Sequence, residues 1–277
     1  MEADPVISRF ITLTTDFGLS DPYVASIKGS IYSTNPNATI IDVSHDILPQ
    51  RIEQAAFVLE YALPYLPKDS IHVLVVDPGV GTNRRAVALT TPSGTFIAPD
   101  NGLLSVALPD QLRASAASLS SVPLPPSHNA YELTNDTYHR KPVSVTFHGR
   151  DIFSPVAAHL SLGVPAEDLG PPVREVVVIP PFRAASSGDS TLNARVVHID
   201  RYGNLITDVR AEQITSGDVS IDISGHTISS LSRTYADGST LTAIVASTGF
   251  LAIVMPNGSA TAELDAGIGD PVIVRLR

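Results

Sequence analysis

Apolar residues follow two different patterns along the chain, and the change of pattern divides it into two parts. Before Gly170, short runs rich in β-branched residues alternate with longer segments that carry apolar residues at helical spacing. The longer segments predict helices at 22–32 and 52–65, and the short runs predict strands at 10–15, 39–44 and 71–76. Strand–helix–strand alternation of this kind is typical of a parallel sheet.

Four further segments of this first part carry weaker signals. Residues 86–91 and 95–98 flank a Pro-Ser-Gly turn and predict a hairpin. The segment 109–130 is rich in Ser, Ala and Pro, and its Pro123-Leu124-Pro125-Pro126 cluster predicts an exposed loop rather than a domain linker. The alternating segment 143–147 predicts a strand, and the segment 152–162 predicts a helix.

After Gly170 the pattern changes to short apolar runs between turns, with no convincing helix from Leu192 onward. The predicted strands are 192–199, 204–209, 218–223, 226–232, 241–246, 250–255 and 271–276. Evenly spaced short strands predict a small β-barrel or sandwich. We therefore expect an N-terminal α/β sandwich domain with a mostly parallel sheet at 1–175, and a smaller C-terminal all-β barrel domain at 190–277.

The composition argues against several classes of binding partner and site. Of 277 residues 43% are hydrophobic, and the formal net charge of −10 argues against a nucleic-acid or anionic-membrane surface. The chain has no cysteine, so neither disulfides nor thiolate metal sites are available. The acidic N-terminus does not resemble a signal peptide, and no apolar run approaches the length of a membrane span. We expect a cytoplasmic protein.

The predicted strand at 71–76 ends in Asp77-Pro78-Gly79-Val80-Gly81, where a proline and two glycines turn the chain sharply. The turn places Asp77 at the carboxyl end of a buried strand, the edge at which open α/β sheets bind ligands. Arg84 or Arg85 is close enough in sequence to fold back toward this aspartate. The alternative is an aspartate that only caps its own turn, because Asp-Pro-Gly is a common turn composition.

Other strand ends of the first domain carry polar residues as well. Asp16 follows the first predicted strand, His45-Asp46 follows the second, and His148 lies at a later strand-to-helix junction. Any one of them alone would be a turn. Together they predict a polar crevice along one edge of the sheet.

Common cofactor and metal motifs are missing from the sequence. The glycines at 79 and 81 lack the remaining spacing of a dinucleotide loop, and no phosphate-binding Gly-Lys-Ser/Thr is present. His45, Asp46 and His148 lack a third partner at zinc-ligand spacing. There is no nucleophile-elbow serine and no cysteine nucleophile. We expect neither a metal ion nor a bound cofactor.

Five separated motifs occur in order along the chain: Thr14-Thr15-Asp16-Phe17-Gly18, Asp77-Pro78-Gly79-Val80-Gly81-Thr82, Pro99-Asp100-Asn101-Gly102-Leu103-Leu104, Thr146-Phe147-His148-Gly149-Arg150-Asp151 and Asp200-Arg201-Tyr202-Gly203-Asn204. With Arg84, they resemble the motifs of the S-adenosyl-L-methionine hydroxide adenosyltransferase family, formerly domain-of-unknown-function-62 proteins and relatives of the fluorinase and chlorinase. The resemblance spans essentially the whole chain.

The resemblance implies hydrolysis of S-adenosyl-L-methionine to adenosine and L-methionine, with the adenosyl compound as substrate and no cofactor. The implied catalytic set is Asp77, Arg84 and His148, which would activate a water or hydroxide for in-line attack on C5′. Which of Asp77 and His148 takes the proton stays open. The resemblance also implies a homotrimer that holds its ligand between the N-terminal domain of one subunit and the C-terminal domain of the next, with pairing of trimers left open.

Substrate contacts are implied in the same way. Asp16 would accept hydrogen bonds from the ribose hydroxyls, and Asp200 and Asn204 would hold the methionine ammonium group. Tyr202 would lie against the ligand, with a place in the core as the alternative.

The remaining implied contacts come with departures from the family pattern. Ser247 and the backbone at Ala260 would contact the carboxylate and the adenine. Thr248 stands where the halogenases have arginine, and Gln50 stands where relatives tend to carry an aromatic residue.

The halogenase branch lacks the aspartate and the histidine that match Asp77 and His148. A negatively charged Asp77 would repel a halide, so the residues favour hydrolysis over halogenation. The alternative from another class is a non-catalytic protein that binds S-adenosyl-L-methionine or adenosine.

Overall fold

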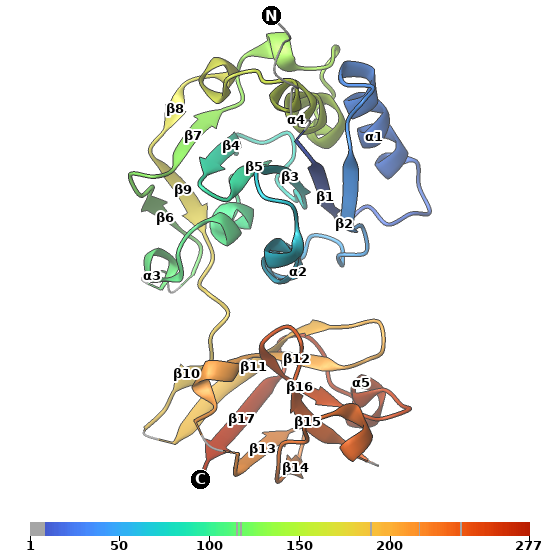
Figure 1. The fold of residues 1–277 in the computed structure, drawn as a ribbon, viewed down its shortest axis with the longest axis vertical. Coiled ribbons are helices and arrows are strands. Elements are labelled where there is room, and N and C mark those ends of the chain that lie inside the picture. The colour runs from blue at the N-terminus through green and yellow to red at the C-terminus, as the bar shows by residue number, and fades with distance from the viewer. Residues whose placement is uncertain (1–8, 115, 117, 189, 216, 239) are drawn as a thin grey trace, which may run out of the picture. The chain divides into compact units, whose positions relative to one another are not determined.

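The structure is a computed structural model that describes residues 9–114, 116, 118–188, 190–215, 217–238 and 240–277. The chain divides into two compact units, Met1–Pro181 and Phe182–Arg277 (Figure 1). Within the described residues, no helix is long and apolar enough to cross a membrane.

A seven-stranded sheet forms the centre of the first unit, in the order β2-β1-β3-β5-β4-β7-β8. The first four strands in this order are parallel, and the remaining neighbours pair antiparallel. The strands are β1 Ile11–Thr15, β2 Ile40–Ser44, β3 Ser70–Val75, β4 Ala86–Thr91, β5 Gly94–Pro99, β7 Asn129–Glu132 and β8 Pro172–Val173. The predicted α/β class is confirmed, and β4 and β5 form the predicted hairpin.

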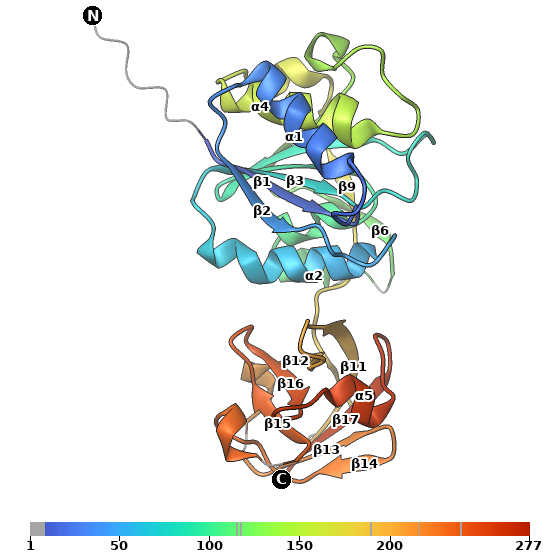
Figure 2. The ribbon, with the colours of Figure 1, turned by 90° about the vertical axis from the view of Figure 1, so that its right-hand side faces the viewer.

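Helices cover both faces of this sheet. Helices α1 (Tyr23–Thr34) and α4 (Ser154–Ser161) pack on one face, and α2 (Ile52–Ala62) packs on the other (Figure 2). The alternation of side chains along β3 explains the arrangement: Val73 belongs to the core on the first face and Leu74 to the core on the second. A strand buried on both faces is why 71–76 reads as a continuous apolar run.

The rest of the first unit consists of short elements. They are η1 Leu63–Tyr65, η2 Leu103–Ala107, α3 Asp110–Arg113, β6 Ser120–Pro123, η3 Asp136–Tyr138, η5 Ala166–Leu169 and β9 Glu175–Val178. The loop predicted at the proline cluster begins after Pro123, which ends β6, and residues 124–128 connect β6 to β7. The sequence analysis did not predict α3 or β6 in the segment 109–130. Strand β6 pairs with β9, and this long-range pairing leaves no local signal in a serine- and proline-rich sequence.

The predicted strand at 143–147 is wrong. These residues, all within the described part, form turns and bends and no strand. Val145 is 71% exposed, so the alternation of apolar and polar residues does not mark a buried sheet face. The segment leads instead into η4 (Gly149–Phe153), one turn of π-helix that continues as α4. Single π-turns inside helices are frequent at functional sites.

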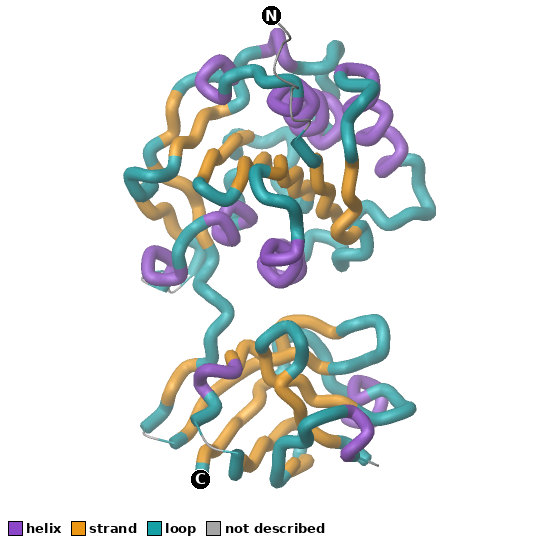
Figure 3. The backbone as a smooth tube through the Cα atoms, in the orientation of Figure 1, coloured by secondary structure: helices purple, strands orange, loops and turns teal. Residues whose placement is uncertain are grey.

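Strands are the main secondary-structure elements of the second unit (Figure 3). An antiparallel sheet runs in the order β14-β13-β17-β11-β12-β16-β15, with β10 paired to β11, and it curls into a nearly closed barrel around one apolar core. Its strands are β10 Ala185–Ser186, β11 Thr191–Ile199, β12 Leu205–Arg210, β13 Val219–Ile223, β14 His226–Ile228, β15 Thr242–Val245, β16 Phe250–Val254 and β17 Pro271–Leu276. The predicted all-β barrel is confirmed.

Three short helical segments interrupt the barrel: η6 Ala211–Gln213, η7 Tyr235–Asp237 and α5 Ala260–Leu264. The expectation that this part contains no helix is therefore wrong for α5. Five residues are too few for an apolar period of 3.6 to be recognised. The hydroxyl of Ser259 caps α5 by accepting from the backbone N–H of Ala262.

Candidate functional site

Asp77, Arg84 and His148 meet in the first unit, although 64 positions separate the arginine from the histidine. Arg84 Nε donates to Asp77 Oδ1 at 2.9 Å, and Arg84 Nη2 donates to Asp77 Oδ2 at 2.5 Å. The same Nη2 lies 2.7 Å from His148 Nδ1. The side chains of Asp77 and Arg84 are only 6% and 10% exposed. The structure thus brings together the three side chains that the sequence predicts as a catalytic set.

The two arginines of the turn have separate partners. Arg85 Nη2 donates to Asp100 Oδ2 at 2.5 Å, and Asp100 Oδ1 in turn accepts from the backbone N–H of Val177 at 2.7 Å. Asn101 Nδ2 donates to the carbonyl of Val76, directly before Asp77, at 3.0 Å. The Asp-Asn pair at 100–101 therefore holds the end of β3 and the start of the turn in place.

Gly81 lets the aspartate turn approach the segment that carries His148. Its φ is +78°, and a Cβ added there would lie 2.5 Å from the carbonyl oxygen of Val145. Only glycine combines a left-handed backbone with so close an approach. The two segments are therefore in backbone contact beside the Arg84–His148 hydrogen bond.

The contact with Arg84 fixes the protonation of His148. A guanidinium has only donors, so Nδ1 must accept, and the ring is neutral with its proton on Nε2. Burial, followed by the positive charge of Arg84, lowers the pKa of His148 below its usual value, against smaller opposing effects of Asp77 and Asp151. Neutral His148 is then the form present at neutral pH, and it presents an N–H donor to a ligand.

A cavity of about 330 Å³ opens beside this set at the carboxyl edge of the sheet. It is lined by Asp16, Phe17, Pro49, Gln50, Val75, Asp77, Pro78, Val80, Thr146, Phe147, His148 and Gly149. Asp16 Oδ2 accepts from the backbone N–H of Gln50 at 2.8 Å, which orients this carboxylate. Asp16, Asp77 and His148 thus share one cavity, as the polar strand ends predict.

His45 does not belong to this cavity. Its ring is buried, and its Nδ1 lies 2.8 Å from the hydroxyl of Thr15, so it supports the end of β1 from within. Neither His45 nor Asp46 lines the opening. The expectation of a polar crevice is right for the first and third strands and wrong for the second.

In the second unit, Asp200, Tyr202 and Asn204 occupy the tight turn between β11 and β12. Asp200 Oδ1 accepts from the backbone N–H groups of Tyr202 and Asn204 at 2.9 and 3.0 Å, and Asp200 Oδ2 accepts from Asn204 Nδ2 at 2.7 Å. Asp200 therefore caps its own turn. Tyr202 is 78% exposed, which excludes a place in the core of this unit.

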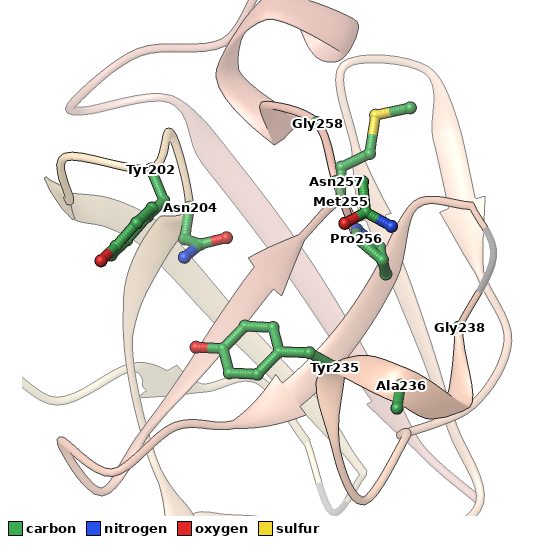
Figure 4. A pocket seen from close by; sticks show the side chains of 9 residues that line it. All are labelled: Tyr202, Asn204, Tyr235, Ala236, Gly238, Met255, Pro256, Asn257 and Gly258. Carbon is green, nitrogen blue, oxygen red and sulfur yellow. The ribbon is translucent and has the colours of Figure 1, made fainter.

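A second cavity, of about 770 Å³, lies beside this turn. Figure 4 shows Tyr202 and Asn204 on one side of it, Met255, Pro256 and Asn257 on the other, and the ring of Tyr235 extending into the opening. The sequence analysis did not identify Tyr235 or Met255 as candidate site residues. Tyr235 follows Thr234, which caps η7, and this capping pattern was the only local signal of an ordered, exposed aromatic residue.

The other two predicted contact residues, Ser247 and Ala260, do not line the second cavity. Ala260 begins α5 with its side chain buried, and the neighbouring Thr261 N–H donates to the carbonyl of Gly203 at 3.0 Å, so the backbone here adjoins the Asp200 turn. Ser247 lies in the turn between β15 and β16 and is not among the residues that line the second cavity. The structure therefore groups Ala260, but not Ser247, with Asp200 and Asn204.

No group of three or more potential metal-ligating side chains was found in the described ranges. The site combines a carboxylate, a guanidinium and a neutral imidazole beside the cavity of about 330 Å³. Such a set binds a water molecule, polarises it and stabilises an oxyanion.

Comparison with known proteins connects this geometry to a family. A hydrolase from Salinispora arenicola, named (R)-S-adenosyl-L-methionine hydrolase, is 37% identical over 96% of this chain and 97% of its own length. A protein of the same name from Salinispora tropica is 42% identical over 71% of this chain and 70% of its own length. A fluorinase from Actinopolyspora mzabensis is 25% identical over 78% of this chain and 77% of its own.

A solved structure extends the likeness to the fold. An uncharacterized conserved protein from Thermotoga maritima superposes with a TM-score of 0.83 at 30% identity, over 97% of this chain and 100% of that one. Residues 11–170 match the profile of the SAM hydroxide adenosyltransferase N-terminal domain, and residues 194–273 match that of the C-terminal domain. The resemblance drawn from the motifs is confirmed: the chain belongs to the SAM hydroxide adenosyltransferase family.

Proposed function

We propose that this protein hydrolyses S-adenosyl-L-methionine to adenosine and L-methionine. The observation that carries the proposal is the contact of Asp77, Arg84 and His148 beside the first cavity, in a chain whose relatives are named for this reaction. The reaction breaks the bond between C5′ and the sulfonium sulfur. Oxygen from water forms the new bond to C5′, and the electron pair of the broken bond leaves with neutral methionine sulfur.

The sulfonium is a good leaving group, so the enzyme has to supply a nucleophile rather than an acid. In the proposed mechanism the Nε2–H of His148 donates to the attacking oxygen, because Nδ1 is occupied by Arg84. Asp77 is then the group left to take the proton, since a carboxylate keeps acceptor sites beyond those that Arg84 uses. Arg84 aligns both partners and stabilises the negative oxygen.

The surroundings favour this step. An anionic oxygen attacks a cationic centre, so charge is neutralised on the way to the transition state, and a poorly hydrated site lowers that barrier. A carboxylate as buried as Asp77 repels a halide from the same place, which is why we propose water and not halide as the nucleophile.

The proposed substrate contacts use side chains and backbone of both units. We propose that Asp16 binds the ribose hydroxyls, because the Gln50 N–H orients its carboxylate in the cavity. The amide nitrogen of Asn204 donates a hydrogen bond to Asp200. Its amide oxygen would therefore accept from the methionine ammonium group, beside the remaining acceptor site of Asp200. Tyr202 would supply an exposed ring to the ligand, and Ser247 and the Ala260 backbone would supply contacts to its carboxylate and adenine.

The test uses purified protein with the (R) and (S) sulfonium epimers of S-adenosyl-L-methionine, supplied separately. We expect adenosine and methionine in equal amounts, with ¹⁸O from labelled water on the 5′ carbon. The variant D77N should lower kcat by about 10² to 10⁴, and R84K should do the same, because a lysine ammonium cannot reproduce the two-nitrogen pairing with Asp77 together with the contact to His148. Tight binding without turnover on long incubation would instead support a binding protein, and no binding of either epimer would contradict both.

We further propose a homotrimer in which the two groups of site residues that act on one substrate molecule come from different copies of the chain. The exposed apolar side chains beside both groups support an interface there: Leu19 and Val145 in the first unit, and Tyr202 and Tyr235 in the second. Light scattering on the eluting protein should give three times the mass of 29.3 kDa, or six times if trimers pair.

A further inference from the structure

The carboxylate of Asp151 is fully buried only three residues after His148. Arg150 binds it with two hydrogen bonds, Nε to Oδ1 at 2.7 Å and Nη2 to Oδ2 at 2.8 Å, and Arg140 Nη1 lies 3.4 Å from Oδ1. None of these three residues lines the first cavity. The proposed reaction therefore leaves a buried carboxylate with two guanidinium partners without a chemical role.

Asp151 also forms hydrogen bonds with the backbone of the preceding segment, residues 140–147. Its carbonyl accepts from the Arg140 N–H at 2.9 Å, its Oδ2 accepts from the Ser144 N–H at 2.9 Å, and its own N–H donates to the Phe147 carbonyl at 3.2 Å. Residues 141–147 form no helix or strand, and most of them are exposed. These three bonds hold the segment at its start, its middle and its end.

The segment reaches the cavity at Phe147, which immediately precedes His148. The guanidinium of Arg150, held by Asp151, lies 5.0 Å from the centroid of the Phe147 ring. On the other side of η4, the guanidinium of Arg84 lies 5.5 Å from the centroid of the Phe153 ring. The orientation of His148 toward Arg84 therefore depends on where η4 and the segment before it are fixed.

Stability alone explains such a cluster poorly. A buried ion pair often contributes little net stability over apolar residues of the same volume, whereas loss of one partner leaves an unpaired buried charge. The ion pairs of Asp151 instead give the edge of the proposed reaction site a rigid geometry.

We propose that Asp151 is a positioning residue for the reaction: through Arg150, Arg140 and the Ser144 backbone it fixes the 140–147 segment so that His148 Nδ1 meets Arg84. This inference rests on the proposed hydrolase function. Asp151 touches no atom of the substrate, and its effect on the reaction passes through Phe147 and His148.

The charged groups that face His148 give the proposal a specific signature. They are Arg84 and Asp77 from the turn after β3, Asp151 from η4, and His139, which directly precedes the 140–147 segment. The positive charge of Arg84 lowers the pKa of His148, and the negative charges of Asp77 and Asp151 raise it. Removal of the Asp151 charge alone would lower the pKa of His148, whereas movement of the ring away from Arg84 would remove the larger effect and raise the pKa.

The experiment compares D151N with the wild type and with D136N in the same protein. Asp136 forms an exposed ion pair with Lys141 at the start of the segment and serves as the matched control. We expect D151N to lower kcat about tenfold or more while KM changes by less than about threefold, because misplacement of a reacting group costs rate rather than affinity. We expect D136N to match the wild type in both.

A readout independent of turnover separates this proposal from the proposed function. The ring of His148, assigned with H148Q, is titrated by NMR in wild type and D151N, and the pKa in D151N should be the higher of the two, because the ring has moved away from Arg84. An unshifted or lower pKa, or a D151N kcat within twofold of wild type, would overturn the positioning role even if the wild type is a good hydrolase. If the wild type shows no turnover, the titration still decides whether Asp151 acts on His148.

A second variant keeps the proposal testable if D151N folds poorly. R140Q removes only the 3.4 Å contact of a half-exposed side chain and leaves the Asp151 carboxylate paired with Arg150. We expect a smaller fall in kcat than in D151N, with an unchanged melting temperature. Wild-type kcat in R140Q, together with a D151N defect that parallels its loss of folded protein, would show that the cluster is only structural.

Discussion

At the scale of single residues, the hydrogen bond between Arg84 and His148 makes activity depend on pH. Nδ1 of a protonated imidazole is a donor and cannot accept from a guanidinium, so protonation breaks the 2.7 Å contact. Because burial and Arg84 lower the pKa of His148, the active neutral form persists below pH 6.5. We predict that kcat is level near neutral pH and falls only as the pH drops below this value, as measured by initial rates in a constant-ionic-strength buffer series.

The control for this profile is a substitution that cannot take up the proton. H148N should lower kcat at all pH values and should lack the acid limb that His148 produces. An acid limb that lies above pH 6.5 in the wild type, or one that survives in H148N, would assign the titration to another group.

Gly81 is a second residue whose role is local and specific. In G81A the new methyl group would lie 2.5 Å from the Val145 carbonyl oxygen at a φ of +78°, so the two loops must separate. We predict a loss of stability of about 1–3 kcal/mol and a fall in kcat beyond that explained by unfolding, because the Arg84–His148 contact lengthens. Urea unfolding and kcat per folded molecule measure the two effects.

Gly163 supplies the matched control, since its φ is +92° and a Cβ there would meet no atom within 4 Å. G163A carries the same backbone strain without the clash and lies outside the site. We expect it to lose stability with kcat unchanged. Equal kcat per folded molecule in G81A and G163A would mean that the approach of the two loops has no catalytic importance.

At the scale of elements, the sequence predicts what periodicity and burial determine. The strands β1, β2 and β3 and the barrel strands β11–β17 follow from apolar runs that pack against a core, so their positions are visible in the chain. The polar ends of β1 and β3 predict the cavity that contains Asp16 and Asp77. These features depend on local sequence and on one rule about parallel sheets.

The sequence alone does not predict elements whose conformation depends on single long-range contacts. The segment 143–147 alternates like a strand, yet Asp151 ties its backbone into a loop. The pairing of β6 with β9 and the entry of Tyr235 into the second cavity likewise depend on distant partners. Asp77, Arg84 and His148 were identified as a set only through the resemblance, because spacing by itself does not show that Arg84 rather than Arg85 turns toward Asp77.

One buried residue of β3 makes the stability of the sheet sensitive to acid. His72 lies opposite Thr12 of β1, with its Nδ1 2.8 Å from the threonine hydroxyl, and burial followed by the charge of Arg9 lowers its pKa to about 4. The unfolded chain takes up this proton near pH 6.5 and the folded chain only near pH 4, so stability falls as the pH drops through this window. At about 1.4 kcal/mol per pH unit, the loss amounts to about 3 kcal/mol.

The measurement is urea unfolding of wild type and H72N at pH 4.5, 5.5 and 6.5. Because asparagine at position 72 does not titrate, the stability of H72N at pH 6.5 should be lower but should decline less steeply toward pH 4.5. Parallel declines in the two proteins would assign the acid sensitivity to other groups.

At the scale of the whole molecule, the proposed function requires residues from both units, and each unit has its own apolar core. In that proposal the first unit would supply the groups that activate water, and the second would supply Asp200, Asn204 and the aromatic side chains that line the larger cavity. Neither set has access to the complete substrate in the proposed reaction. The proposed trimer would join them across copies of the chain, and this arrangement has a quantitative consequence.

Two inactive variants should restore each other's activity. D77N damages only the first unit and N204A only the second, so a site made from the first unit of N204A and the second unit of D77N is intact. In a random equimolar trimer, about one quarter of the sites have this composition. We therefore predict that co-expressed, co-purified D77N and N204A chains show about one quarter of wild-type kcat per chain, although each variant alone is nearly inactive. If the two groups acted within one chain, every site in the mixture would carry a damaged group and no activity would return, because exchange of whole chains cannot repair it.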